Sequence, residues 1–298
     1  MFPHTPARFF VVMLALTCVT AIDSLRAQGP RERTMYVSAV GAKGEPVAGL
    51  GADDFIIREE GAAREVLRVT RAIEPLDIAI LVDNGAASEG VIPRVREGLT
   101  AFTGAMAKGN QIAIVGLADR PTILVDYTQS LTRLHQGIGL LWPQTQAAST
   151  LLDAVYEISR GLGRRDAPRA VMVLVVTDGA DFANRQFAQV AHEVRQANVA
   201  IHVITVGSFA ALDDDEVRNR ARLLSETTRV SGGQRVNLLT PTAVPQALER
   251  LGRELSSQYK VVYGRPDSLI PPEKIAVSAR RPEVTMRGAL ERVTGTPR

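Results

Sequence analysis

Residues 77–84 read Asp-Ile-Ala-Ile-Leu-Val-Asp-Asn, and this stretch decides the fold class. Ile78–Val82 is an unbroken apolar run, and three of its five residues are β-branched. Such a run is typical of a strand buried on both faces, as in a parallel sheet covered by helices. The run ends at Asp83, and Gly85 follows. Ligands of open α/β sheets bind in the loops after the carboxyl ends of the strands, so we expect Asp83 to lie in a functional loop.

A second apolar run, Val171–Val176, repeats the pattern and is followed by Thr177, Asp178 and Gly179. Between and after these runs, strand-like and helix-like segments alternate, which predicts a parallel sheet. We expect an α/β domain with a doubly wound, mostly parallel six-stranded sheet and helices on both faces. The expected helices are 88–108, 131–141, 151–162, 187–198, 213–230 and 242–255, and the other strands are 112–117, 122–125, 199–206 and 236–239.

Both ends of the chain have the composition of β structure. Residues 31–74 and 258–288 contain short runs of β-branched and aromatic residues separated by glycine and proline turns. So few strands do not bury a core alone. We therefore predict that segments 31–74 and 258–288 pair in a small β module beside the main domain, 75–257, with a tail at 289–298.

Three loops and their flanks resemble a known family. Val-Asp-Asn-Gly-Ala-Ala (82–87), Ala-Ser-Thr-Leu-Leu-Asp-Ala (148–154) and Val-Thr-Asp-Gly (176–179) resemble the loops of a von Willebrand factor A domain, over about 76–257. The pairs Gly49-Leu50 and Asp54-Phe55, and the later Gln258-Tyr259 with Tyr263, resemble segments of bacterial secreted proteins of this group. The resemblance implies a Rossmann-like fold in which 122–125 is an antiparallel edge strand.

The resemblance also implies a metal-ion-dependent adhesion site, in which a divalent ion bridges the domain to a carboxylate of its partner. By position, Asp83, Ser149 and Asp178 match metal-site residues of the family. Gly85 and Ala87 stand where the family has two metal-binding serines. The prediction is therefore a degenerate site that holds Mg²⁺ weakly through three protein oxygens and water. The alternative is that Asp83 and Asp178 cap helices or bond loop amides without metal.

A partner protein or domain is expected to dock on the loops at 83–88, 142–150 and 178–184. The residues predicted to contact it are Asn84, Ser88, Trp142, Thr150 and Asp181. Trp142 is the only tryptophan, and tryptophan is enriched at interface hot spots. Buried packing of Trp142 is the alternative.

The first 27 residues have the layout of a signal peptide, with Arg8, an apolar run at Phe9–Ile22, and a cleavage site after Ala27. This predicts a secreted or periplasmic protein, and the run is too short for a membrane span. A retained anchor is the alternative. The only cysteine, Cys18, lies in this segment, and the net charge of +3 gives no argument for nucleic acid as a partner.

The sequence contains no pattern that indicates an enzyme. There is no Gly-x-Ser-x-Gly or His-Glu-x-x-His motif, and the loop at 83–88 lacks the dinucleotide fingerprint. We expect His202 to be a core residue with its hydrogen bonds satisfied, and Arg164, Arg165 and Arg169 to form a solvated turn. The function predicted is an exported, non-catalytic protein-binding module. The alternatives are a metal-free structural scaffold with a dead site and, more distantly, a hydrolase or nucleotide-binding enzyme.

Overall fold

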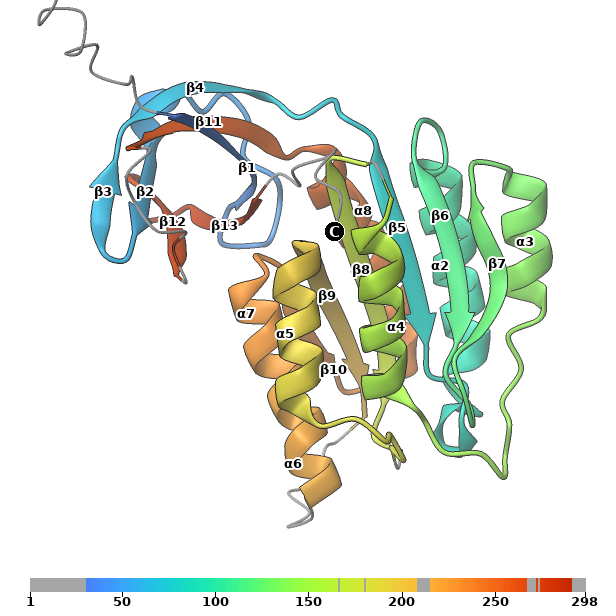
Figure 1. The fold of residues 1–298 in the computed structure, drawn as a ribbon. Helices are drawn as coiled ribbons and strands as arrows, with labels where there is room; N and C mark the ends of the chain where they lie inside the picture. Colours follow the sequence, from blue (N-terminus) through green and yellow to red (C-terminus); the bar gives the residue numbers. More distant parts are fainter. Residues whose placement is uncertain are drawn as a thin grey trace, which may run out of the picture.

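The computed structural model describes residues 31–165, 167–179, 181–207, 215–266, 272 and 274–290. The predicted signal peptide, residues 213 and 214 of a predicted helix, and 291–298 of the tail lie outside these described residues. Within them, a central sheet with helices on both faces is joined to a β module at one end (Figure 1).

The central sheet has six strands in the order β10-β9-β8-β5-β6-β7. All neighbouring pairs are parallel except β6 and β7, which are antiparallel. This confirms the predicted fold class and the antiparallel edge strand. The strands are β5 (Leu76–Val82), β6 (Gln111–Gly116), β7 (Thr122–Thr128), β8 (Arg169–Thr177), β9 (Val199–Val206) and β10 (Arg235–Leu238).

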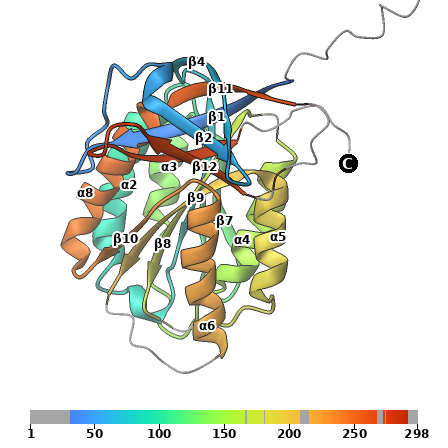
Figure 2. The same cartoon turned by 90° about the vertical axis from the view of Figure 1, so that its left-hand side faces the viewer.

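Helices cover both faces of this sheet, so every residue of β5, β8 and β9 is buried, and most of these residues are apolar. Seen from the side, α2 and α8 lie on one face and α4 and α5 on the other (Figure 2). Each face has its own apolar core. The helices are α2 (Ile92–Met106), α3 (Leu131–Gly139), α4 (Leu151–Gly163), α5 (Phe187–Ala197), α6 (Asp215–Arg222), α7 (Thr228–Val230) and α8 (Val244–Ser256), with short 3-10 turns at Ala52–Asp54, Ala86–Ser88 and Pro241–Ala243.

The segment predicted as one helix over 213–230 is interrupted. A π-helical turn, Leu223–Thr227, separates α6 from α7. Hydroxyl groups in this region turn back to the helix, since Thr228 Oγ1 donates to the carbonyl of Leu224 at 2.8 Å. Such local bonds compete with regular helical geometry, and π turns are frequent at functional sites.

The two chain ends pair in the β module, as the sequence predicted. Strand β1 lies between β11 and β13, and both neighbours are antiparallel to it. A second sheet has the order β12-β2-β3, and one apolar core is shared by residues of both sheets. The strands are β1 (Arg31–Val40), β2 (Phe55–Glu59), β3 (Ala62–Arg64), β4 (Val66–Arg71), β11 (Tyr259–Arg265), β12 (Ile275–Ala279) and β13 (Thr285–Leu290).

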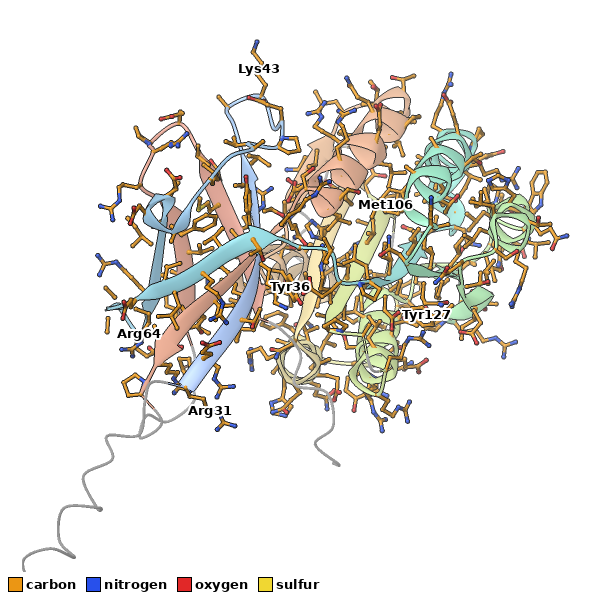
Figure 3. All side chains as sticks on the ribbon, turned by 90° about the horizontal axis from the view of Figure 1, so that it is seen from above. Arg31, Tyr36, Lys43, Arg64, Met106 and Tyr127 are labelled. Carbon is orange, nitrogen blue, oxygen red and sulfur yellow. The ribbon has the colours of Figure 1, made fainter. Side chains whose placement is uncertain are left out.

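A buried arginine joins the β module to the main domain. Arg169, at the start of β8, donates to the carbonyls of Glu74 (2.8 Å) and Leu255 (2.9 Å) and to Gln258 Oε1 (2.6 Å). Gln258 in turn donates to Ser38 Oγ at 2.9 Å. Figure 3 shows Tyr36 of β1 at this junction, and its ring lies 5.2 Å from the Arg169 guanidinium.

The predicted solvated turn of arginines is therefore wrong for Arg169. Burial lowers the pKa of Arg169 to about 10, so the side chain stays protonated at neutral pH. Arg165, nearby in sequence, donates to Asp77 Oδ2 at 2.6 Å. Arg165 and Arg169 thus form hydrogen bonds within the fold at the amino-terminal edge of the sheet, opposite the predicted functional loops.

His202 of β9 lies in the core, but its hydrogen bonds are not satisfied as predicted. Its side chain is buried, and neither ring nitrogen has a hydrogen-bond partner among the described residues. Burial lowers the pKa of His202 to about 4; the charge of Glu254 opposes this shift and that of Arg287 adds to it. The folded state therefore holds this imidazole neutral.

This pKa predicts a loss of stability in acid. The ordinary value of 6.5 holds in the unfolded chain, so unfolding takes up a proton as the pH falls from about 6.5 towards about 4. A shift of this size corresponds to roughly 3 kcal/mol of unfolding free energy. In urea unfolding at several pH values, His202→Leu should remove this part of the acid dependence, whereas His135→Leu, on the exposed side of α3, should not. An unchanged acid dependence in His202→Leu would contradict the assignment.

Candidate functional site

Three loops meet at the carboxyl edge of the sheet, where β5 and β8 end. Asp83 follows β5, and its amide donates to the carbonyl of Val175 in β8 at 2.8 Å. Ser149 precedes α4, and its backbone bridges Ala118 after β6 and Asp181 after β8. The sheet topology thus brings together loops that lie far apart in the sequence.

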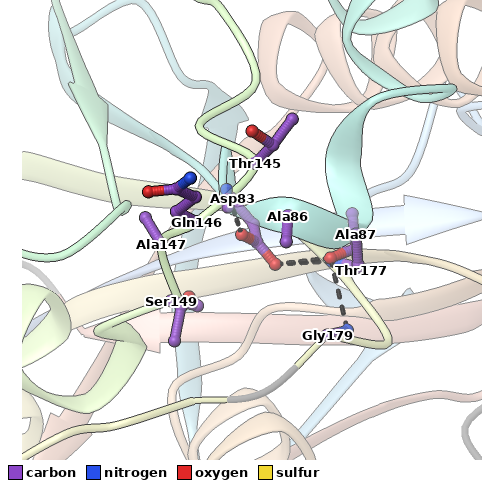
Figure 4. A pocket seen from close by; sticks show the side chains of 11 residues that line it. Asp83, Ala86, Ala87, Thr145, Gln146, Ala147, Ser149, Thr177 and Gly179 are labelled. Atoms are coloured by element: carbon purple, nitrogen blue, oxygen red, sulfur yellow. Dashed lines mark hydrogen bonds between the residues drawn. The ribbon is translucent and has the colours of Figure 1, made fainter.

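The Asp83 carboxylate is buried, with 3% of the residue exposed, and accepts hydrogen bonds from both sides. Oδ2 accepts from Thr177 Oγ1 at 2.6 Å and from the Thr177 amide at 3.2 Å. Oδ1 accepts from the Gly85 amide at 3.1 Å. Figure 4 shows the chain of bonds from Asp83 through Thr177 to Gly179. These bonds meet the requirement that a buried carboxylate be hydrogen-bonded.

A buried guanidinium from α6 balances this charge. The Arg220 side chain donates from Nη1 to the carbonyl of Gly179 and from Nη2 to the carbonyl of Thr177. Nη2 also lies 3.8 Å from Asp83 Oδ2. Arg220 comes three residues before Leu223, which is buried in the core of that face, so the helix turns both side chains inward.

The first loop leaves no room for a side chain at Gly85. A Cβ atom there would lie 2.8 Å from the carbonyl oxygen of Ala147 in the second loop. The same carbonyl accepts from the amide of Ala86 at 2.9 Å. Gly85 is therefore required by the close approach of two backbones. Beside it lies a cavity of about 290 Å³, lined by Asp83, Ser149, Thr177 and neighbouring loop backbone.

The three residues predicted to hold metal are not all at this cavity. Asp83 and Ser149 line it, and the buried Ser149 hydroxyl has no hydrogen-bond partner among the described residues. Asp178 is exposed and does not line it. The Asp178 carboxylate lies instead against Gly207 after β9, where an added Cβ would be 2.8 Å from Oδ2.

A family model for the von Willebrand factor type A domain matches residues 77–232, just over half of the chain. The chain belongs to the von Willebrand factor type A domain family. No curated protein matches it significantly.

Solved structures similar to this VWA chain include the pilus adhesin SpaC from Lactobacillus rhamnosus GG, with 10% identity over 86% of this chain and 48% of that one, at a TM-score of 0.51. Proximal thread matrix protein 1 from the mussel byssus is 14% identical over 66% of this chain and 51% of that one, at 0.50. The vWF domain of the pili tip protein Mfa5 from Porphyromonas gingivalis is 12% identical over 62% of this chain and 96% of that one, at 0.47. This chain thus spans about half the length of the first two, and the likeness concerns the fold.

The residues of this VWA domain do not fit the metal of the family. Positions 85 and 87 supply no side-chain oxygen, and Asp178 faces away from the cavity. The Asp83 oxygens already accept from Thr177 and Gly85, with the Arg220 cation alongside. Among the described residues, no group of three acidic, histidine or cysteine side chains is arranged to hold a metal ion. Of the two expected donors that line the cavity, Asp83 and Ser149, only the Ser149 hydroxyl has no hydrogen-bond partner among the described residues.

Four of the five residues predicted to contact a partner lie beneath the loop surface. Asn84, Ser88, Thr150 and Asp181 are buried. They hold the loops together instead: Asn84 Oδ1 accepts from the amides of Leu117 and Ala118, and Ser88 Oγ donates to the carbonyl of Gly85. Polar side chains at these positions satisfy loop backbone groups that would otherwise be buried without partners.

Trp142 is the exception, with 62% of the residue exposed. The Arg96 guanidinium of α2 lies 4.0 Å from the centre of its ring and donates to the carbonyls of Gly139 and Leu141. Arg96 thus holds both the indole and the loop that carries it, because a guanidinium stacks on aromatic rings while its edge donates hydrogen bonds. The alternative of buried packing for Trp142 is excluded.

Sequence reasoning missed Arg220 and Phe182. The arginine lies about 40 residues beyond the loops that it bonds, in a helix whose charges resemble those of any solvated surface. Phe182 lies in the third loop and is as exposed as Trp142. An aromatic residue in that loop was a usable signal, whereas nothing local distinguished Arg220 from its neighbours.

Asp181 has an unusual environment for a carboxyl group. Its Oδ1 accepts from the amide of Leu151 at the start of α4, and its buried Oδ2 has no hydrogen-bond partner among the described residues. Burial raises the pKa of Asp181 to about 6; nearby Arg220 opposes this shift, while Asp83 and Asp153 add to it.

This shift predicts that Asp181→Asn stabilises the protein at neutral pH. A raised pKa means that the stability present below about pH 4 is lost as the pH rises through about 6. The loss is at most about 3 kcal/mol. The asparagine side chain cannot ionise and can still accept from Leu151, so unfolding in urea should show a gain at pH 8 that disappears near pH 4. The exposed control, Asp126→Asn, should show no such gain; a loss of stability in Asp181→Asn at pH 8 would refute the assignment. As the pH rises from about 4 to about 6, titration of Asp181 lowers the stability of the fold and titration of His202 raises it. The two effects are therefore measured in separate single variants.

Proposed function

We propose that this chain is a non-catalytic protein-docking module whose contact surface is the loop face at the carboxyl edge of the sheet. The observation that carries the proposal is a group of exposed apolar side chains there. Of the eight large apolar side chains that are exposed among the described residues, five lie at this edge. They are Ile123, Leu140, Trp142, Phe182 and Leu239.

The topology places all five along one edge, which extends from the outer strand β7 to the opposite outer strand β10. Ile123 pairs with Val115 near the end of β6, and Leu239 follows the end of β10. Leu140 and Trp142 follow α3, which runs back to this edge from the end of β7 (Figure 1). Trp142 and Phe182, on loops between these outer strands, are of the aromatic types that are enriched at protein interfaces.

Trp142 is the expected anchor of the docking surface. The Arg96 contact holds its ring before any partner arrives, which lowers the entropy lost on binding. The chain's membership in the VWA family and the fold that it shares with a pilus adhesin support a binding role. The partner would be a protein with an apolar surface patch. A structural scaffold without a partner at this face is the competing function.

The docking surface can be tested with photo-crosslinking residues placed at 142 and at 73. Ile73 is a matched control because it is exposed and apolar but lies at the opposite edge of the sheet. A partner should crosslink at 142 and not at 73. Against the partner so identified, Trp142→Ala and Phe182→Ala should each weaken binding about ten-fold or more, and Ile73→Ala should not. Equal crosslinking at both sites, or unchanged affinity in Trp142→Ala, would favour the scaffold.

We further propose that the protein is exported and acts outside the cytoplasm. Support comes from the signal-peptide pattern in the first 27 residues. As a separate finding, each helix in the part of the chain that the structure describes is too short or too polar to span a bilayer.

Amino-terminal sequencing of the protein made in a bacterial host should find cleavage after Ala27 in the exported fraction. Replacement of Leu16 by Arg should disrupt the apolar run and leave uncleaved protein inside the cell. Detection of Met1 in the exported protein would instead favour a retained anchor.

A further inference from the structure

One positive charge lies where the acidic loops of this VWA domain meet. Arg220 is 5% exposed, and its guanidinium bonds the carbonyls of Thr177 and Gly179, the two residues that flank Asp178. The same group lies 3.8 Å from Asp83 Oδ2. A single side chain from α6 therefore contacts the loop after β8 and pairs with the acid after β5.

We propose that the Arg220 guanidinium is the resident cation of this site, in place of a metal ion, and that the loop face keeps its shape without divalent cations. A carboxylate buried as deeply as Asp83 requires a counter-charge or several strong donors. Arginine provides a permanent charge at any physiological pH. The inference concerns the loops themselves and does not require the docking proposed above.

The hydrogen bonds of the site favour the guanidinium over a metal. A divalent ion bound to Asp83 Oδ2 would have to displace the Thr177 hydroxyl, which is bonded at 2.6 Å, or share the oxygen with it. It would also lie within a few ångströms of the Arg220 charge, and like charges at that distance repel. The carbonyls of Thr177 and Gly179, two further oxygens in the loop after β8, already accept from Arg220.

A guanidinium also differs from a metal in what it permits. A metal ion leaves coordination positions for a partner's carboxylate, whereas Nη1 and Nη2 of Arg220 donate to carbonyls of its own chain. A partner of this face therefore does not need an acidic residue to reach the site. Docking should then persist in the presence of a metal chelator.

The test compares the purified wild-type chain with Arg220→Met, Asp83→Asn and the double variant. Methionine keeps most of the side-chain length but removes the charge. Arg220→Met alone leaves Asp83 uncompensated, so its thermal midpoint should fall by about 10 °C. In the Asp83→Asn background the same substitution should cost clearly less, because there is no charge left to balance. Equal losses in both backgrounds would overturn the proposal.

Metal binding is measured directly with Mn²⁺ by electron paramagnetic resonance. At about 1 mM Mn²⁺, a concentration near the dissociation constants of the weakest protein cation sites, the wild-type chain should bind no Mn²⁺. The same concentration of Mg²⁺ should leave the thermal midpoint of the wild-type chain unchanged. Arg220→Ala, which leaves space for a hydrated ion beside Asp83, should gain Mn²⁺ binding that Arg220→Ala/Asp83→Asn lacks. Wild-type binding of Mn²⁺ that Asp83→Asn abolishes would overturn the proposal, even if Arg220→Met did not fold. Because these readouts involve no partner, they are independent of the crosslinking result.

Discussion

The pairing of a buried carboxylate with a buried guanidinium organises the loop face of this protein. Asp83 follows the central strand β5, and Arg220 comes from helix α6 and bonds the loop after β8. Removal of one partner from a buried ion pair typically costs about 3–5 kcal/mol, because the remaining charge loses its compensation. The two therefore hold the loop after β8 and helix α6 against the end of β5. The other buried polar residues of the face, Asn84 and Thr150 among them, extend this framework to the loops after β6 and before α4.

The loop face consists of two layers of side chains that differ in burial and polarity, and sequence similarity alone does not distinguish them. The lower layer is polar, buried and bonded within the chain. The upper layer consists of exposed apolar groups, with Trp142 held by Arg96 and Phe182 on the neighbouring loop. In a site that binds through metal, the lower layer would contact the partner. In this chain the lower layer supports loops, and the upper layer is the part of the face that is exposed to solvent.

The β module is attached at the opposite edge of the sheet and so leaves the loop face open (Figure 1). Its link to the main domain depends on buried polar bonds as well as apolar packing. Arg169 bonds the segment before β5, the end of α8 and the segment before β11. Glu254 of α8 accepts from Gln234 and from Arg287 of β13, near the buried His202. Such bonds require one relative position of the two parts, because a displaced partner would leave a buried polar group unsatisfied.

The sequence by itself determined the fold class, the family and the pairing of the chain ends. An unbroken apolar run such as Ile78–Val82 and a helical apolar stripe such as that of α2 both report burial directly, because burial is a local requirement on each side chain. The motifs at 82–87, 148–154 and 176–179 identified the loops because each motif is a contiguous stretch of sequence. Only the tertiary structure decided which side chains of those loops face outward and which cation lies among them. Asn84 turned inward to satisfy backbone groups of the loop after β6, Ser88 bonded a carbonyl of its own loop, and Arg220 reached Asp83 from a distant helix. Such partners are set by the packing of distant segments, and no local pattern of residues encodes them.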